Sequence, residues 1–212
     1  MTITRRDIIQ QIAVMLGGTA LAGGDRLLAF TFEEDALGQA MTQGVGAFTV
    51  ADVALLDEIA DTILPETSTP GAKAAKTGAF MALMVTDVYT LPLQQVFGDG
   101  LRSIDEDCRR VHGMTFMQAA PAQRLGVVEA LDREQQRVMD ARRPTPSNRA
   151  PAPESTATEP PHYFRMMKEL TLLGYFTSEV GCTKALRYIE SPGRFDPCAP
   201  HAPGDRAWSG HA

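Results

Sequence analysis

The sequence has few of the residues that build metal-held or membrane-spanning folds. Its 212 residues include three cysteines and four histidines, and none has the C-x-x-C or H-x-x-x-H spacing of closed zinc sites and haem attachment. Its N-terminal apolar stretch, 12–22, has about 11 residues, whereas a membrane-spanning helix needs roughly 20. We therefore expect no metal site and no direct membrane span in this chain.

Cofactor and nucleophile motifs are also missing. The pairs Gly44/Gly46 and Gly98/Gly100 come nearest to a dinucleotide fingerprint, but neither follows a predicted strand. No G-x-S-x-G elbow or phosphate-binding loop is present. The formal charge is −6, from 20 Lys+Arg against 26 Asp+Glu, and no basic cluster carries interleaved aromatics. These absences argue against flavin or nicotinamide binding, serine hydrolysis and nucleic-acid binding.

The composition itself is that of a globular protein. With 44% hydrophobic and 22% charged residues, the chain can bury a core without disulfide or metal support. No segment alternates with the period of a strand, so we predict an all-α fold. We divide the chain into a signal peptide (1–22), a connecting segment (23–48), a compact multi-helix domain (49–190) with a Pro-rich exposed loop (144–161), and an extended C-terminal tail (191–212).

The N-terminus has the layout of an export signal. Arg5 and Arg6 are followed by Ile8 and Ile9 and then by the apolar stretch 12–22. This order resembles the twin-arginine motif, and the modest hydrophobicity fits that pathway. The alternative is an ordinary amphipathic helix that contains two arginines.

Small residues follow the apolar stretch. Ala20 and Ala22 form an A-x-A pattern, which predicts cleavage after Ala22 and a periplasmic location. Twin-arginine export serves proteins that fold, and often load a cofactor or a partner, before they cross the membrane. Because the chain has no cofactor motif of its own, the cargo that needs this route is expected to be a partner.

Helix boundaries are well marked in places. Thr49 with Asp52 approximates a capping box, and Pro65 stops the helix that follows. One helix carries an apolar residue at every third or fourth position before the capping Gly113. That stripe comprises Phe97, Leu101, Ile104, Cys108 and Val111.

Three further stretches have helical spacing. We expect a short helix around 33–41 and a longer one from Pro121 to about Ala141. An apolar run over 80–88 ends before Pro92, and the segment 163–189 reads as two helices broken near Gly174 or Gly181.

One acidic cluster is a candidate for catalysis. Asp57 and Asp61 are one helical turn apart and Glu58 lies beside them, so they could act as a general acid and base. Carboxylates beside an apolar stripe more often form the solvated face of a helix, and we prefer that interpretation.

The odd number of cysteines leaves at least one thiol over in an oxidising compartment. Cys108 lies on the apolar stripe and Cys182 is ambiguous. Cys198 lies in an extended stretch and is the best candidate for a covalent link. Its partner is either another polypeptide or, internally, Cys108.

Three motifs resemble a known family. They are DEIADTILPETSTPGA (57–72), GMTFMQAAPAQR (113–124) and TLLGYFTSEVGCTKALRYIESPGRFDPC (171–198). In this order they resemble the gluconate 2-dehydrogenase subunit 3 family over about 49–198. The Pro-rich segment departs from the family's shorter connection.

The resemblance implies a non-catalytic small subunit without a cofactor. Its partner would be a large FAD flavoprotein of the glucose-methanol-choline type, commonly assembled with a c-type cytochrome. The small subunit would carry the export signal for both, acting as escort and stabiliser. The GYFTSE element looks closer to relatives that oxidise glycosides at the 3-position (glucoside 3-dehydrogenases) than to gluconate-specific ones.

The third motif supplies interface candidates. Tyr175 and Phe176, with Ser178 and Glu179 nearby, combine aromatic and hydrogen-bonding groups as contact centres do. The alternative is that these residues pack helices within this chain.

The tail supplies the other interface candidates, namely Pro192, Gly193 and Phe195, because an extended segment without its own core needs a surface to order it.

Two other functions stay open. The chain could be an independent periplasmic helical enzyme that uses its acidic helix residues, or a sugar-binding or scaffold module without a flavoprotein.

Overall fold

The structure is a computed structural model that describes residues 36–142, 159–189, 191, 193, 198 and 202–209. These residues form helices and no strand, as predicted, with only two isolated β-bridges. A short helix over 36–43 precedes the main elements. The main elements are α3 (Val50–Ile63), the 3-10 turn η1 (Ala72–Ala75), α4 (Thr77–Val88), α5 (Leu91–His112), α6 (Pro121–Ala141), α7 (Tyr163–Thr177) and the π-helical turn η3 (Gly181–Ala185).

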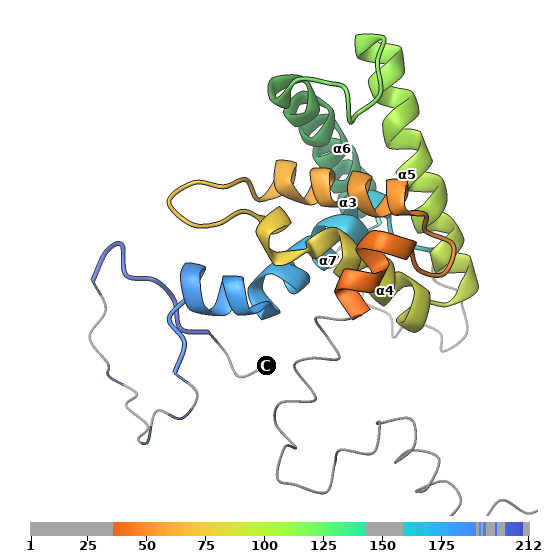
Figure 1. The fold of residues 1–212 in the computed structure, drawn as a ribbon. Coiled ribbons are helices and arrows are strands. Elements are labelled where there is room, and N and C mark those ends of the chain that lie inside the picture. Colours follow the sequence, from red (N-terminus) through yellow and green to blue (C-terminus); the bar gives the residue numbers. More distant parts are fainter. Residues whose placement is uncertain are drawn as a thin grey trace, which may run out of the picture.

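Helix α7 is the central element of the packing. It contacts α3, α4, α5 and α6, while α3 also packs against α4, α6 and η1. Helices α5 and α6 stand together on one side, with their connection at the top of the view in Figure 1. The core between these elements is apolar, and its largest fully buried side chains include Phe97, Phe116 and Phe164. No described helix has the length and apolar character needed to cross a membrane.

Local signals set several helix ends. The Thr49 hydroxyl accepts the Asp52 N–H at 3.2 Å, and the Asp52 carboxylate accepts the Thr49 N–H at 2.8 Å, which completes the predicted capping box. Gly113 ends α5 in the left-handed region at φ 73°, as a C-cap glycine does. Pro92 lies in the first turn of α5, while α4 has already ended at Val88.

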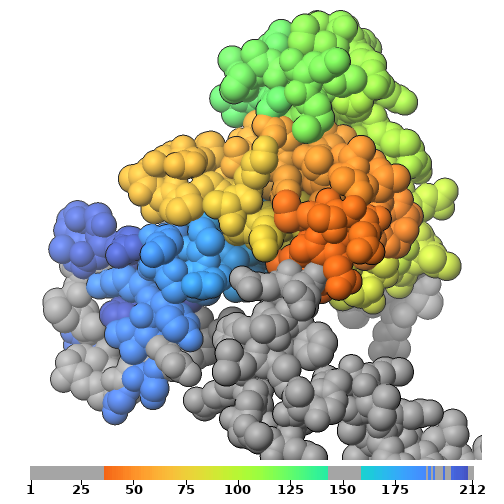
Figure 2. Space-filling view, viewed as in Figure 1, coloured from red at the N-terminus to blue at the C-terminus, as the bar shows by residue number. Residues whose placement is uncertain are grey.

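The apolar stripe of α5 is buried over most of its length. Phe97, Leu101, Ile104 and Cys108 are all buried, but Val111 is 60% exposed. Val111 lies in the last turn of α5. This end of α5, in light green, protrudes at the top of the molecule in Figure 2. The stripe therefore extends beyond the elements that cover it.

A close approach fixes α5 against α7 at Gly100. A Cβ atom at Gly100 would lie 2.2 Å from Cγ of Tyr163, whereas one at Gly98 would have no atom nearer than 3.8 Å. Gly100→Ala should lower the free energy of unfolding by about 1–3 kcal/mol through overpacking. Gly98→Ala, on the same helix, should raise it by up to about 1 kcal/mol through helix propensity. Urea unfolding of both variants tests this, and equal effects would contradict the packing.

The chain after α7 folds back on itself. Helix α7 continues through Gly174 and ends at Thr177, so the predicted break lies at Ser178, between the two expected glycines. After η3, the Arg187 N–H donates to Ala207 O at 2.9 Å, and the Ser209 N–H donates to Arg187 O at 2.8 Å. Residues 202–209 of the tail therefore pair with the chain's own segment after η3.

Candidate functional site

The three motifs, far apart in the sequence, meet at one place in the fold. Glu58 of α3 pairs with Arg124 at the start of α6, and Lys73 of η1 pairs with the other oxygen of Glu58 at 2.7 Å. The Tyr175 hydroxyl of α7 donates to Pro70 O at 2.5 Å. Asp57, beside Glu58, completes the group. We call Asp57, Glu58, Pro70, Lys73, Arg124 and Tyr175 the motif junction.

Arg124 joins three segments at the motif junction. Its Nη1 bonds to Glu58, its Nε donates to Phe116 O at 2.9 Å and its Nη2 donates to Met117 O at 2.7 Å. The Arg124 and Glu58 side chains are only 15% and 16% exposed. Each of the three guanidinium nitrogens thus has an acceptor, as a largely buried cation requires.

The charges at Glu58 and Lys73 stabilise each other. Burial alone would raise the pKa of Glu58, but hydrogen bonds and charge from Lys73 and Arg124 outweigh it, so that pKa lies below its ordinary value. The hydrogen bond to Glu58 raises the pKa of Lys73. Both groups are therefore held in their charged forms.

Asp57 has a different environment. Its side chain is buried, and Oδ1 accepts the Gly78 N–H of α4 at 2.7 Å. Burial raises the pKa of Asp57, although the bond from Gly78 and the charge of Lys73 act in the opposite direction. A Cβ at Gly78 would lie 2.4 Å from the Asp57 nitrogen, so the glycine makes this contact possible.

The expectation of a solvated acidic face was wrong for Asp57 and Glu58. Helix α3 packs against α4, α6 and η1, so the side of the helix beside its apolar stripe is covered too. Asp61 is half-buried and accepts the Lys73 N–H at 3.4 Å. The cluster therefore serves as an internal brace, with partners on three elements, α4, η1 and α6.

The two carboxyl groups give opposite pH dependences. Because the folded pKa of Asp57 is raised, its ionisation destabilises the fold as the pH rises from its ordinary value of 3.8 through the folded value. Because the folded pKa of Glu58 is lowered, its ionised carboxylate stabilises the fold above pH 4.5, its ordinary pKa. This stabilisation is lost as the pH falls through the folded pKa.

Asp57→Asn separates these two contributions, since an amide oxygen can still accept the Gly78 N–H. Relative to the unchanged protein, the variant should gain unfolding free energy as the pH rises through the acid range and keep the gain at neutral pH. Urea unfolding at a series of pH values measures this. A gain that shrinks with rising pH would contradict the burial of a raised-pKa carboxyl.

The motif junction holds an exposed loop in a fixed position. Residues 65–68 are exposed, while the Ala72 N–H donates to Leu64 O at 2.9 Å at the base of the loop. Tyr175 holds the other side through Pro70. In Figure 2 this loop, in yellow-orange, lies on the same side of the molecule as the blue chain after α7.

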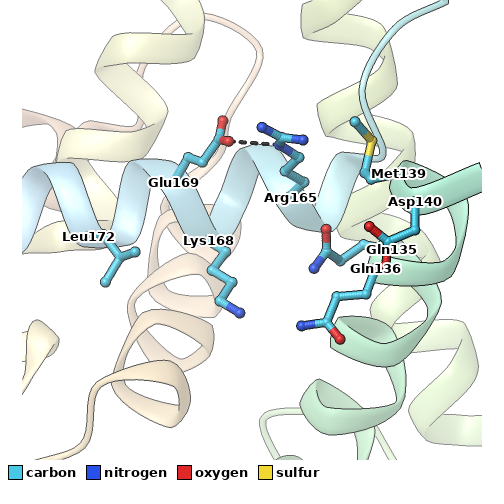
Figure 3. A pocket seen from close by; sticks show the side chains of 8 residues that line it. All are labelled: Gln135, Gln136, Met139, Asp140, Arg165, Lys168, Glu169 and Leu172. Atoms are coloured by element: carbon cyan, nitrogen blue, oxygen red, sulfur yellow. Dashed lines mark hydrogen bonds and ion pairs between the residues drawn. The ribbon is translucent and has the colours of Figure 1, made fainter. Parts of the chain in front are cut away.

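A shallow groove lies between α6 and α7 and has a volume of about 300 Å³. Figure 3 shows its lining, which is Gln135, Gln136, Met139, Asp140, Arg165, Lys168, Glu169 and Leu172. Arg165 pairs with Glu169 at 2.7 Å, and Lys168 pairs with Asp132 at 2.7 Å. With both cations paired and no aromatic ring in its lining, this groove gives no support to the sugar-binding alternative.

The interface candidates of α7 divide into inner and outer residues. Tyr175 is only 4% exposed, and the Ser178 hydroxyl donates to Tyr175 O at 2.7 Å. Both residues therefore serve packing within this chain, which is the alternative given in the sequence analysis. Phe176, which is 38% exposed, and Glu179 lie at the surface. Gly193 is exposed at φ 70°.

The other predicted residues lie outside the described part of the chain. These are Arg5, Arg6, Ile8, Ile9, Ala20, Ala22, Pro192 and Phe195, together with most of the Pro-rich loop.

The cysteines do not form the internal bridge considered above. Cys108 is a free thiol within the buried stripe of α5, and burial raises its pKa. Cys198 is exposed, and its link to another polypeptide stays a prediction. The ambiguous Cys182 is buried, with Sγ 3.2 Å from Phe176 O and 3.2 Å from the Ser209 hydroxyl.

Sequence reasoning missed the roles of Lys73, Gly78 and Arg124. A signal for two of them was present. Arg124 ends the second motif and Lys73 immediately follows the first, so each motif segment had a cation that could neutralise the acidic cluster. Gly78 gave no such signal.

The fold and the motif junction define a small all-helical domain whose motifs serve its own packing. A family model described as gluconate 2-dehydrogenase subunit 3 matches residues 51–193, which include two of the motifs and most of the third. The chain belongs to this family, as its motifs predicted, and the family name makes it a subunit of a gluconate 2-dehydrogenase complex. No curated protein and no solved structure matches the chain.

Proposed function

We propose that this chain is the non-catalytic small subunit of an exported FAD-dependent sugar dehydrogenase, which it carries to the periplasm and stabilises there. One observation carries the non-catalytic role. Three charged groups of the motif junction, Glu58, Lys73 and Arg124, are bonded to one another inside the domain. Side chains that are bonded to one another in this way are not available to bind or act on a substrate. The export role is supported by the signal-like layout of residues 1–22.

In this proposal the sugar is oxidised on the partner, a flavoprotein of the glucose-methanol-choline type. FAD held by that partner takes the hydride, and a c-type cytochrome receives the electrons. The GYFTSE element at 174–179 favours a glycoside oxidised at the 3-position. This chain supplies the export route and a docking face, on which Phe176, Thr177 and Glu179 are the exposed members of that element.

Capture of the full chain after co-expression with its flavoprotein tests the proposal. We expect a complex that contains FAD and oxidises sugars with an artificial electron acceptor, while the chain purified alone does neither. Turnover by the chain alone would instead establish the independent enzyme. Capture without any flavoprotein would favour a scaffold or sugar-binding module.

A further inference from the structure

The chain after α7 forms a surface in which the third motif meets the returning segment 202–209. Arg187 and Trp208 lie side by side in a parallel β-bridge, and the Arg187 guanidinium stacks over the indole with 4.5 Å between its carbon and the ring centroid. The Arg206 guanidinium donates to Lys184 O at 2.6 Å, which ties the returning segment to η3. We call the surface formed by Phe176, Arg187, Tyr188, Arg206 and Trp208 the bridge patch.

Contacts of Cys182 bring the end of α7 into this patch. Its Sγ lies 3.2 Å from Phe176 O and 3.2 Å from the hydroxyl of Ser209, the neighbour of Trp208. Phe176 and Trp208, which are 32 positions apart, therefore belong to one region of the surface.

The bridge patch has the composition of a binding hot spot. Trp208 is the chain's single tryptophan, yet it is 52% exposed, and Tyr188 beside Arg187 is 49% exposed. Tryptophan, tyrosine and arginine are the residues that dominate binding energy at protein interfaces. The stack also orders the indole and the guanidinium before binding, which lowers the entropic cost of association.

Charge indicates what covers the patch. The whole chain carries −6, but among the residues of this region that the structure describes, Lys184, Arg187 and Arg206 outnumber Glu179 and Asp205. A local excess of positive charge on an acidic protein favours a partner surface rich in carboxylates.

We infer that the bridge patch docks the catalytic flavoprotein through an apolar recess for the Trp208 indole, bordered by carboxylates. This inference rests on the proposed function and adds the docking residues to it. An anionic membrane surface would also suit aromatic and basic side chains, but a subunit family requires a protein contact, and a pre-stacked Trp–Arg pair suits a shaped recess.

The test measures the affinity of the full chain for the flavoprotein. Trp208→Ala should weaken binding about 30-fold or more, the loss typical of a hot-spot residue. Tyr188→Ala, which leaves the bridge intact, should weaken it about fivefold or more. Leu91→Ala, at the 79% exposed Leu91 on α5, is the matched control and should bind unchanged. Arg206→Glu should slow association and reduce its dependence on salt.

The outcomes separate the two proposals. If Trp208→Ala and Tyr188→Ala bind as tightly as the unchanged chain, the bridge patch is not the docking surface, although the proposed function stands. If the unchanged chain binds no flavoprotein, the proposed function fails first. Sedimentation with phosphatidylglycerol vesicles is the third arm: vesicle binding that needs Trp208, with flavoprotein binding unaffected, would overturn the inference in favour of a membrane contact.

Discussion

Replacement of Arg5 and Arg6 by lysine will leave the catalytic flavoprotein in the cytoplasm. Lysine keeps the charge but not the guanidinium shape, and the twin-arginine motif depends on the arginine pair. If the flavoprotein crosses only when bound to this chain, periplasmic dehydrogenase activity should fall to the level of cells without the chain. Fractionation and assay of both compartments with an artificial acceptor measure this.

The chain contains its own control for this change. Arg109 and Arg110 form a second arginine pair, on the exposed end of α5, where they pair with Asp105 and Asp107. Lysines at these positions keep the charges of the exposed pairs and should leave export unchanged. Normal export of the flavoprotein with lysine at both signal positions would contradict the escort role.

Arg124→Ala will destabilise the domain by about 3–5 kcal/mol, as the loss of one partner from a buried ion pair does. The change leaves Glu58 with Lys73 alone and removes the donors to Phe116 O and Met117 O. The free energy of unfolding in urea measures the loss.

Arg133→Ala is the matched control for this loss. Arg133 is 65% exposed and pairs with Glu129 at 3.7 Å on α6, so its removal should cost less than about 1 kcal/mol. Glu58→Leu combined with Arg124→Met should recover much of the loss, because the Glu58 carboxylate is then removed together with its largely buried partner. Equal losses for Arg124→Ala and Arg133→Ala would contradict the bracing role of the motif junction.

Features that depend on neighbouring residues were predictable from the sequence. The capping box at Thr49, the C-cap at Gly113 and the helix start at Pro121 each need a few adjacent positions, and the structure confirms all three. The family was predictable because each of its motifs is a continuous stretch of sequence.

Features that depend on distant residues were not predictable. Glu58 and Arg124 are 66 positions apart, and nothing near Glu58 shows that α6 will cover it. Trp208 and Arg187 meet because the tail turns back, a geometry that the aperiodic tail did not indicate. Tyr175 and Phe176 differ by one position on a helix, about 100°, which is enough to bury one ring and expose the next.

The central claim is that this subunit transports and stabilises a redox partner and holds no redox centre itself. The absorption spectrum and sugar-oxidising activity of the full chain, purified alone and then as the complex, test it most directly. We predict no flavin or haem absorption and no turnover for the chain alone, and flavin absorption with turnover for the complex. A tightly bound flavin or haem in the isolated chain, together with turnover, would contradict the account.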